Sequence, residues 1–309
     1  MIKQINCNKK NYLDNLTKFL DVRRSSKKPE NKIISKILSD IKKNKNKALI
    51  KYEKKFSKNS QIKPSIKEIN NAIKFLDPKI KKAIDFALKR IFNFHIKQKN
   101  KNILYKDSLN NKIEYKYVPI QSVGIYVPAN LPSTLLMNAI PAKIAGVKRI
   151  VLANPKNNGK LNPAVLYAAK KLGINEIYSM GGAQAIGSLA YIQKVNKIVG
   201  PGNIFVAGAK RQVFGDVGIE GMIAGPSEIT ILADGKTNLN EVTTSMIGQA
   251  EHDINSQCIL ITKDSNLIKK FKKDLISKLK KIPRQSIATK SIKNNGLILK
   301  VNNDKQIIN

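Results

Sequence analysis

The feature that most constrains this chain is an alternation that begins near residue 120. Short runs of aliphatic and β-branched residues there take turns with longer segments whose apolar residues recur at helical spacing. Such alternation is typical of βαβ units, in which a helix returns the chain so that successive strands are parallel. The chain is therefore expected to be an α/β protein, with two parallel sheets or one long one.

Glycine, proline and asparagine mark where the expected elements start and stop. Asn162 would cap a helix that has Pro163 at its first position and Gly173 just past its end. Pro201-Gly202-Asn203 would open another helix. The strands expected from this alternation are 148–154, 176–180, 197–200, 228–234, 257–264 and 296–301.

The first part of the chain has a different character. Residues 1–30 are polar and rich in lysine, and helical apolar spacing begins at Ile34. Asp77 followed by Pro78 predicts a further helix, whose stripe reaches His95, a histidine expected in a core or interface rather than on a metal. We expect two Rossmann-like parallel-sheet domains with a helical N-terminal lead-in. Their predicted limits are a polar segment at 1–30, a discontinuous first α/β domain from 31–120 with 227–309, and an inserted Rossmann-like domain at 121–226.

The formal net charge of +36 raises the alternative of a nucleic-acid-binding protein. The distribution of the charge argues against it, because lysines are spread over all polar segments and arginine, which suits phosphate and guanine contacts, is scarce. We therefore expect no nucleic-acid partner. The arginines are Arg23, Arg24, Arg90, Arg149, Arg211 and Arg284.

Membrane, secretory and disulfide-linked classes are also disfavoured. No apolar run reaches the roughly eighteen residues that span a bilayer, and the N-terminus lacks the apolar region and cleavage site of a secretory signal. Cys7 and Cys258 stand far apart, which argues against a disulfide framework and against a thiolate metal site. A cytoplasmic protein without a membrane partner is expected.

Two glycine-rich turns could carry binding chemistry. MGGAQAIG (180–187) and VGPGN (199–203) each join an expected strand to an expected helix, where glycine permits close approach and a helix start offers free N–H groups. Neither has GxGxxG spacing. Taken singly, each could equally be a tight turn of a doubly wound sheet.

A second group of polar residues lies nearer the C-terminus. Gln249 and His252 are three residues apart, so on a helix they would share one face and could meet one ion or one substrate. Glutamine is an unusual zinc ligand, and without other information His252 is expected to be a polar core residue rather than a ligand. Ser227 precedes a strand, and a Ser-His hydrolase is formally open although no GxSxG elbow exists.

Six segments, taken together in their order and spacing, resemble the histidinol dehydrogenase family. The helix that ends in FNFHIKQ (92–98) resembles the N-terminal region of the family as well, so the resemblance covers nearly the whole chain. The six segments are VGIYVP (123–128), PSTLLMNAIPAKIAGV (132–147), 162–191, 195–215, MIAGPSEITILAD (222–234) and QAEHDINSQCILIT (249–262).

The resemblance implies an enzyme that oxidises L-histidinol to L-histidine through an aldehyde and reduces two NAD molecules in turn. Zinc would position the substrate, and a homodimer would share its active sites between subunits. The residues that match NAD contacts of the family are Tyr126, Gln184 and Asn203. Ser227 matches its substrate-contacting serine, and Gln249 with His252 match zinc and substrate ligands.

The resemblance also implies departures from the family. The Glu-His pair that does the acid-base work, and the other zinc ligands, would follow Asn309, so no catalytic residue is assigned here and a C-terminal truncation is expected. The loops at 126–134 and 190–200 are shorter than those of the family. An inactive remnant that retains at most ligand binding is therefore the alternative to an active enzyme.

Overall fold

The structure is a computed structural model that describes residues 2–25, 31–157, 159–220 and 227–308. The chain divides into two compact units. The central unit is Pro29–Ala224, and the terminal unit combines Met1–Lys28 with Gly225–Asn309. Each unit contains a sheet whose strands are all parallel, so the α/β class with two parallel sheets is confirmed.

The sheet of the central unit has the strand order of a Rossmann-like fold. Its order is β6-β5-β4-β7-β8, in which β4 lies in the middle and the chain moves outward first to one side and then to the other. The strands are β4 (Ser122–Tyr126), β5 (Arg149–Ala153), β6 (Glu176–Tyr178), β7 (Lys197–Val199) and β8 (Gly218–Ile219).

Helices cover both faces of this sheet, because successive side chains of a strand point to opposite faces. Val123 and Ile125 join one core with α3 (Ile66–Lys74), α4 (Pro78–His95), α5 (Pro132–Ile144) and α6 (Pro163–Lys171). Tyr126 and Val151 join the other core with α2 (Asn31–Ser57), α7 (Gly182–Tyr191) and α8 (Ile204–Val213).

The position of the N-terminal helices corrects the expected domain limits. Residues 31–95 belong to the central unit, not with 227–309, because the apolar stripe of α2 packs on α7. A Cβ on Gly187 of α7 would lie 3.1 Å from the Leu38 side chain, so the two helices approach closely there. The stripe that predicted α2 identified a buried face but not the surface that buries it.

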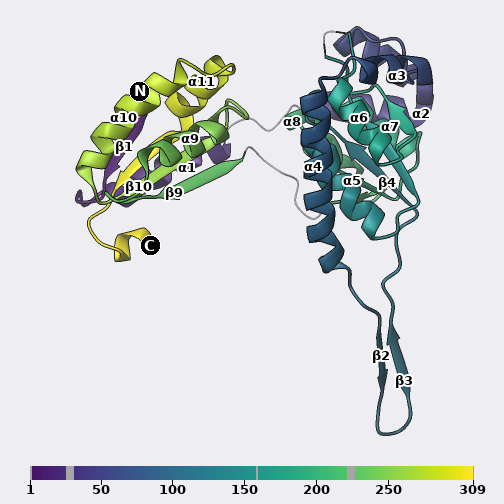
Figure 1. The fold of residues 1–309 in the computed structure, drawn as a ribbon, viewed down its shortest axis with the longest axis horizontal. Helices are drawn as coiled ribbons and strands as arrows, with labels where there is room; N and C mark the ends of the chain where they lie inside the picture. The colour runs from purple at the N-terminus through teal and green to yellow at the C-terminus, as the bar shows by residue number, and fades with distance from the viewer. Residues whose placement is uncertain (1, 26–30, 158, 221–226, 309) are drawn as a thin grey trace. The chain divides into compact units, whose positions relative to one another are not determined.

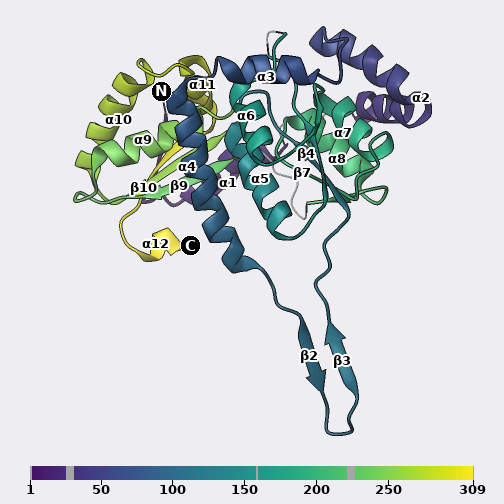
Figure 2. The same cartoon turned by 45° about the vertical axis from the view of Figure 1, so that its right-hand side comes forward.

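A hairpin that the sequence did not predict extends from the central unit (Figures 1 and 2). It follows a short 3-10 turn, Ile96–Gln98, and pairs β2 (Ile103–Lys106) with β3 (Lys112–Tyr115) in antiparallel register. Every residue of both strands is exposed.

The terminal unit is built on the sheet β1-β11-β10-β9. Its edge strand β1 and the helix α1 come from the segment 1–30, which was expected to be only polar, because Ile5 joins the small core formed with Leu297 and Leu299. One further helix, α11, was not predicted, whereas the short α12 matches the single helical turn expected at 305–308. The strands are β1 (Lys3–Asn6), β9 (Glu228–Leu232), β10 (Gln257–Thr262) and β11 (Gly296–Lys300), and the helices are α1 (Tyr12–Ser25), α9 (Leu239–Ala250), α10 (Ser265–Leu279), α11 (Gln285–Asn295) and α12 (Lys305–Ile308).

The core of the terminal unit lies between this sheet and α9, α10 and α11 (Figure 2). Phe271 of α10 is fully buried, and Cys258 of β10 packs in the same cluster. Cys7 and Cys258 are both buried. None of the described helices is long and apolar enough to cross a membrane.

Candidate functional site

The candidate cofactor site is the carboxyl edge of the central sheet. The switch point of this sheet lies between β4 and β7, and open α/β sheets bind their ligands outside the carboxyl ends of the strands at such a point. Tyr126 is the last residue of β4, and Gly200–Asn203 follow directly on β7. Gln184 lies in the first turn of α7, which follows β6. The structure therefore brings all three expected NAD residues to one edge.

The turn after β7 rests directly on the end of β4. Gly200 has a φ of +104°, and a Cβ there would lie 2.1 Å from the Tyr126 carbonyl oxygen, so only glycine fits. The Gly200 N–H donates to Glu220 Oε2 at 2.9 Å. Lys210 of α8 donates through Nζ to the Gly200 carbonyl and to Glu220 Oε1.

Lys210 is thus a buried cation that fixes the Gly200 peptide groups. Its residue is 2% exposed, and burial lowers the pKa of its ammonium while the nearby Glu220 carboxylate opposes that shift. Since breaking a buried pair leaves an uncompensated charge, this ion pair resists any movement of the turn. The Lys210–Glu220 pair therefore contributes to the candidate site by keeping the Gly200 turn rigid.

Asn203 caps α8 as the sequence predicted. Its Oδ1 accepts the N–H groups of Phe205 and Val206, both at 3.1 Å. The residue is exposed at the end of the VGPGN turn. The first N–H groups of α8 are therefore satisfied by the protein rather than left open for an anion.

The second glycine turn is held in a similar way. The Gly182 N–H donates to the Tyr126 hydroxyl at 3.4 Å, and the Gly181 N–H donates to Glu53 Oε1 at 2.8 Å. Gln184 Nε2 also donates to Glu53 Oε1, at 2.8 Å. Tyr126 and Gln184 are only 6% and 3% exposed, so both side chains brace the turn from inside.

Burial changes the acid-base behaviour of two of these groups. It raises the pKa of the Tyr126 hydroxyl to about 12, with a smaller contribution from the Glu53 carboxylate. It also raises the pKa of Glu53, although the hydrogen bonds from Gly181, Gln184 and Ser57 oppose the shift. The candidate site therefore contains a neutral phenol at physiological pH and a carboxyl group that is costly to ionise.

The predicted substrate and metal residues lie in the terminal unit, at the amino edge of its sheet. Ser227 immediately precedes β9, and its carbonyl accepts the Gln257 N–H at 3.1 Å. Gln249 is in the last turn of α9, which leads to the amino end of β10. Because the strands are parallel, Ser227 and the turn after α9 share one edge.

The helix expected to carry both Gln249 and His252 is shorter than predicted. α9 ends at Ala250, and His252 lies in the turn beyond it, where its N–H donates to the Gln249 carbonyl at 3.3 Å. The imidazole is on an exposed residue, so the alternative of a polar core histidine is wrong. Gln249 Nε2 is buried without a hydrogen-bond partner among the described residues.

These residues alone do not complete a zinc site. Structural and catalytic zinc takes three or four protein ligands, whereas Gln249 and His252 offer one amide oxygen and one imidazole. Within residues 2–25, 31–157, 159–220 and 227–308, no three His, Cys, Asp or Glu side chains form a group that could hold a metal ion. His95 is satisfied elsewhere, since its Nδ1 lies 2.6 Å from Gln98 Oε1.

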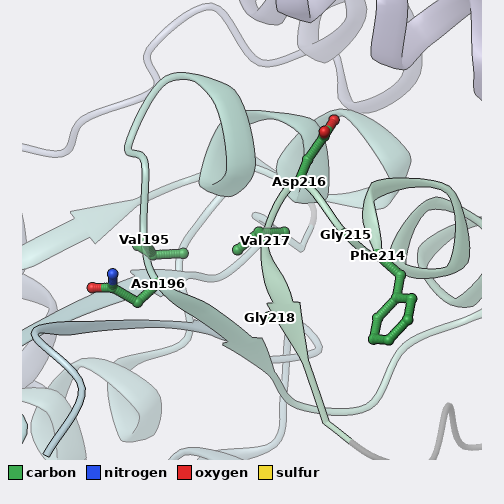
Figure 3. Close-up of a pocket in the computed structure, with 7 residues that line it drawn as sticks. All are labelled: Val195, Asn196, Phe214, Gly215, Asp216, Val217 and Gly218. Atoms are coloured by element: carbon green, nitrogen blue, oxygen red, sulfur yellow. The ribbon is translucent and has the colours of Figure 1, made fainter.

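A hollow in the surface of the central unit lies away from the carboxyl edge. It has a volume of about 390 Å³ and is lined by Val195, Asn196 and Phe214–Gly218 (Figure 3). Asn196 and Val217 directly precede β7 and β8, so this hollow is at the amino ends of the strands. It does not coincide with the candidate cofactor site.

Comparisons with known proteins decide the family. The family described as histidinol dehydrogenase matches residues 21–309. A histidinol dehydrogenase of Pelagibacter ubique (strain HTCC1062) is 55% identical over 316 residues, which cover 100% of this chain and 74% of that protein. The chain belongs to the histidinol dehydrogenase family.

Two further members of the family extend the comparison. The histidinol dehydrogenase of Rhodospirillum rubrum is 40% identical over 290 residues, or 90% of this chain and 67% of that protein. The crystal structure of the histidinol dehydrogenase from Elizabethkingia anophelis superposes with a TM-score of 0.89 at 35% identity, and covers 99% of this chain and 72% of that one. Histidinol dehydrogenases are oxidoreductases, and such extended similarity does not favour the inactive remnant.

Sequence reasoning missed three residues that hold the candidate site, namely Glu53, Lys210 and Glu220. One signal was available for Glu53, because it lies four residues after Leu49 on the buried stripe of α2, where a charged residue is unusual. No comparable signal marked Lys210 among so many lysines. Only its position over the Gly200 turn distinguishes it.

Proposed function

We propose that this protein is an NAD-dependent dehydrogenase that oxidises L-histidinol to L-histidine through the aldehyde, late in histidine biosynthesis. Each of the two steps removes a hydride, which NAD accepts, and the second step also consumes one water. The observation that carries the proposal is the carboxyl edge of the central sheet, where Tyr126 and Asn203 flank the switch point of a Rossmann-ordered sheet and Gln184 follows β6 at the same edge. Membership of the family supplies the substrate.

Within this proposal, NAD would lie against the VGPGN and MGGAQ turns. Asn203 is exposed and available to a ligand, whereas Tyr126 and Gln184 are almost fully buried and would each offer the cofactor only a small part of their surface. Both turns are already held by side chains of the unit, so little ordering is needed on binding.

Ser227, Gln249 and His252 would bind the substrate, and Gln249 with His252 would supply two of the zinc ligands. The unpartnered Gln249 Nε2 is a hydrogen-bond donor, so it supports contact with an acceptor atom of the substrate, while Oε1 would be the zinc ligand. Zinc would hold the alcohol and imidazole of L-histidinol in place as a Lewis acid. The described residues contain no group of three His, Cys, Asp or Glu side chains that could hold a metal ion, so they do not supply the remaining zinc ligands.

We also propose that the protein is a homodimer, and the hairpin supports this. Ile103, Tyr105, Ile113 and Tyr115 share one face by strand register, and each is between 56% and 59% exposed. A two-stranded hairpin is marginal in water, so an apolar face of this kind needs a partner surface. The opposite face carries Lys106 and Lys112.

The activity is tested by incubating the full chain with L-histidinol, NAD and zinc while NADH is followed by absorbance. Two NADH per L-histidinol consumed are expected, and an amino alcohol without the imidazole ring serves as the substrate control. A chain that binds NAD but forms no NADH would contradict the enzymatic proposal.

The dimer is tested separately by light scattering after size-exclusion chromatography. Replacing Tyr105 and Ile113 by Ser is expected to yield monomers, whereas replacing Lys106 and Lys112 by Ser on the opposite face is not. A monomeric unaltered chain, or equal behaviour of the two variants, would refute the role of the hairpin. The cytoplasmic location and the absence of a nucleic-acid partner remain predictions.

A further inference from the structure

Glu53 is the least expected polar group in the central unit. It lies near the end of α2 with 1% of its residue exposed, in a position where a carboxyl group loses nearly all its hydration. Its Oε1 accepts from the Gly181 N–H and the Gln184 amide, while Oε2 is buried without a hydrogen-bond partner among the described residues. Since carboxylates are seldom fully buried without a cation, this position calls for an explanation beyond packing.

The geometry shows what the carboxyl group does. A single oxygen, Oε1, accepts both the Gly181 N–H and Gln184 Nε2, each at 2.8 Å. It therefore ties the backbone at the start of the glycine turn to the side chain two residues into α7. Both connections come from a helix more than a hundred residues earlier in the chain.

The same contact fixes the orientation of the Gln184 amide. A carboxylate only accepts hydrogen bonds, so it selects the NH2 group of the amide and turns the carbonyl oxygen away from itself. That oxygen, Gln184 Oε1, lies 2.9 Å from the place of a Cβ on Gly182, which has a φ of +59°. The amide thus presents an acceptor, and not a donor, toward the glycine turn.

We propose that Glu53 is a positioning residue for NAD, which holds Gln184 with its oxygen toward the cofactor and anchors the Gly181–Gly182 turn. This inference rests on the proposed function. The chemistry that such an acceptor recognises is an O–H or N–H donor, which NAD offers in its ribose hydroxyls and its carboxamide. Glu53 acts through Gln184 and the turn rather than by contact with substrate.

The test compares two variants of Glu53 in the full chain by calorimetric titration with NAD. Glu53→Gln keeps an oxygen that can accept both hydrogen bonds and is expected to bind NAD within about twofold of the unaltered chain. Glu53→Leu fills the same space without an acceptor and is expected to weaken NAD binding about tenfold, the loss that corresponds to one hydrogen bond.

A control variant separates positioning from stability. Leu49→Ala truncates a buried core residue one turn away on α2, so it lowers the stability of the same unit without touching the turn. Its NAD affinity below the unfolding temperature is expected to equal that of the unaltered chain. If Leu49→Ala and Glu53→Leu weaken NAD binding equally, Glu53 has no positioning role.

A double-mutant cycle with Gln184→Ala identifies the route of the effect. If Glu53 acts through Gln184, then Glu53→Leu has a smaller effect on NAD affinity in the Gln184→Ala background than alone. Additive effects would overturn the inference. An unaltered chain that fails to bind NAD overturns the proposed function and this inference with it, whereas normal binding by Glu53→Leu overturns the inference alone.

Discussion

The two sheets of this protein carry their candidate residues in opposite ways. In the central unit, the residues at the carboxyl edge are held by buried groups, since Glu53 fixes one glycine turn and the Lys210–Glu220 pair fixes the other. In the terminal unit, Ser227 and His252 are exposed at the amino edge. One set is braced by buried hydrogen bonds, whereas the side chains of the other set are exposed.

This difference has a physical reason. A cofactor bound by shape and hydrogen bonds gains affinity when its surface is preorganised, because no ordering entropy is then lost on binding. A metal supplies its own strong bonds and can order ligands that are loose without it. If the structure is right, changes at the turns of the central unit should lower its stability strongly. Changes at the exposed residues of the terminal unit should leave stability almost unchanged.

The largest effect is expected from Gly200→Ala. The added Cβ would lie 2.1 Å from the Tyr126 carbonyl oxygen, and the alanine backbone would have to keep a positive φ. The free energy of unfolding should therefore fall by about 3 kcal/mol or more. Chemical denaturation measures this change. Gly215→Ala is the matched control, since Gly215 has a φ of +101° but no atom within 4 Å of the added Cβ. Equal losses in the two variants would show that the close approach to β4 is unimportant.

Lys210→Met should have the next largest effect. Loss of the buried ammonium leaves Glu220 and the Gly200 carbonyl without their partner, and about 2–3 kcal/mol of stability should be lost. The comparison variant is Lys42→Met, which removes an exposed ion pair with Asp216 and should change stability by less than about 0.5 kcal/mol. Thermal unfolding of both variants gives the measurement. Similar melting temperatures would show that the Lys210–Glu220 pair does not stabilise the Gly200 turn.

A smaller effect should accompany the ionisation of Tyr126 at high pH. Its pKa in the folded state is raised to about 12, above the ordinary 10.0, so its contribution is fully present below pH 10 and is lost as the pH rises through about 12. Tyr126→Phe cannot ionise and should lose less stability than the unaltered chain over this interval. Denaturation at pH 9, 10 and 11 measures the difference, and parallel pH profiles would disprove the burial of the phenol.

The smallest effect on stability is expected from His252→Ala. The side chain is exposed beyond the end of α9, so the free energy of unfolding without metal should change by less than about 0.5 kcal/mol. Zinc affinity, measured with a competing chelator, should nevertheless fall. His95→Ala is the control for loss of a histidine from the central unit and should leave zinc affinity unaltered. A large change in metal-free stability would mean that the terminal edge is as preorganised as the central one.

The local elements were predicted well because their signals are local. Asp77, Asn162 and Asn203 each cap the helix that the sequence assigned to them, through the short hydrogen bonds that make these residues good caps. The six strands expected between 148 and 301 were placed within a few residues of their observed limits, whereas the short β8 was not predicted. Neither the caps nor the strand periodicity requires any distant part of the chain.

Elements that depend on distant partners were missed or misplaced. β1 lies in a segment of lysine and asparagine and becomes a strand only because β11 pairs with it almost three hundred residues later. The hairpin β2–β3 has no buried residue to mark it in the sequence. The assignment of 31–120 to the wrong sheet has the same cause, since an apolar stripe does not specify its partner.

The α/β class, the starts and ends of the main helices and the residues that match the family could be predicted from the sequence, because propensity, capping and periodicity act over a few residues. Only the tertiary structure decided that α2 covers the central sheet and brings Glu53 beneath the MGGAQ turn. It also decided that one lysine among many, Lys210, is buried over Gly200. Burial and hydrogen bonding at these positions are properties of surfaces that meet only when the chain folds.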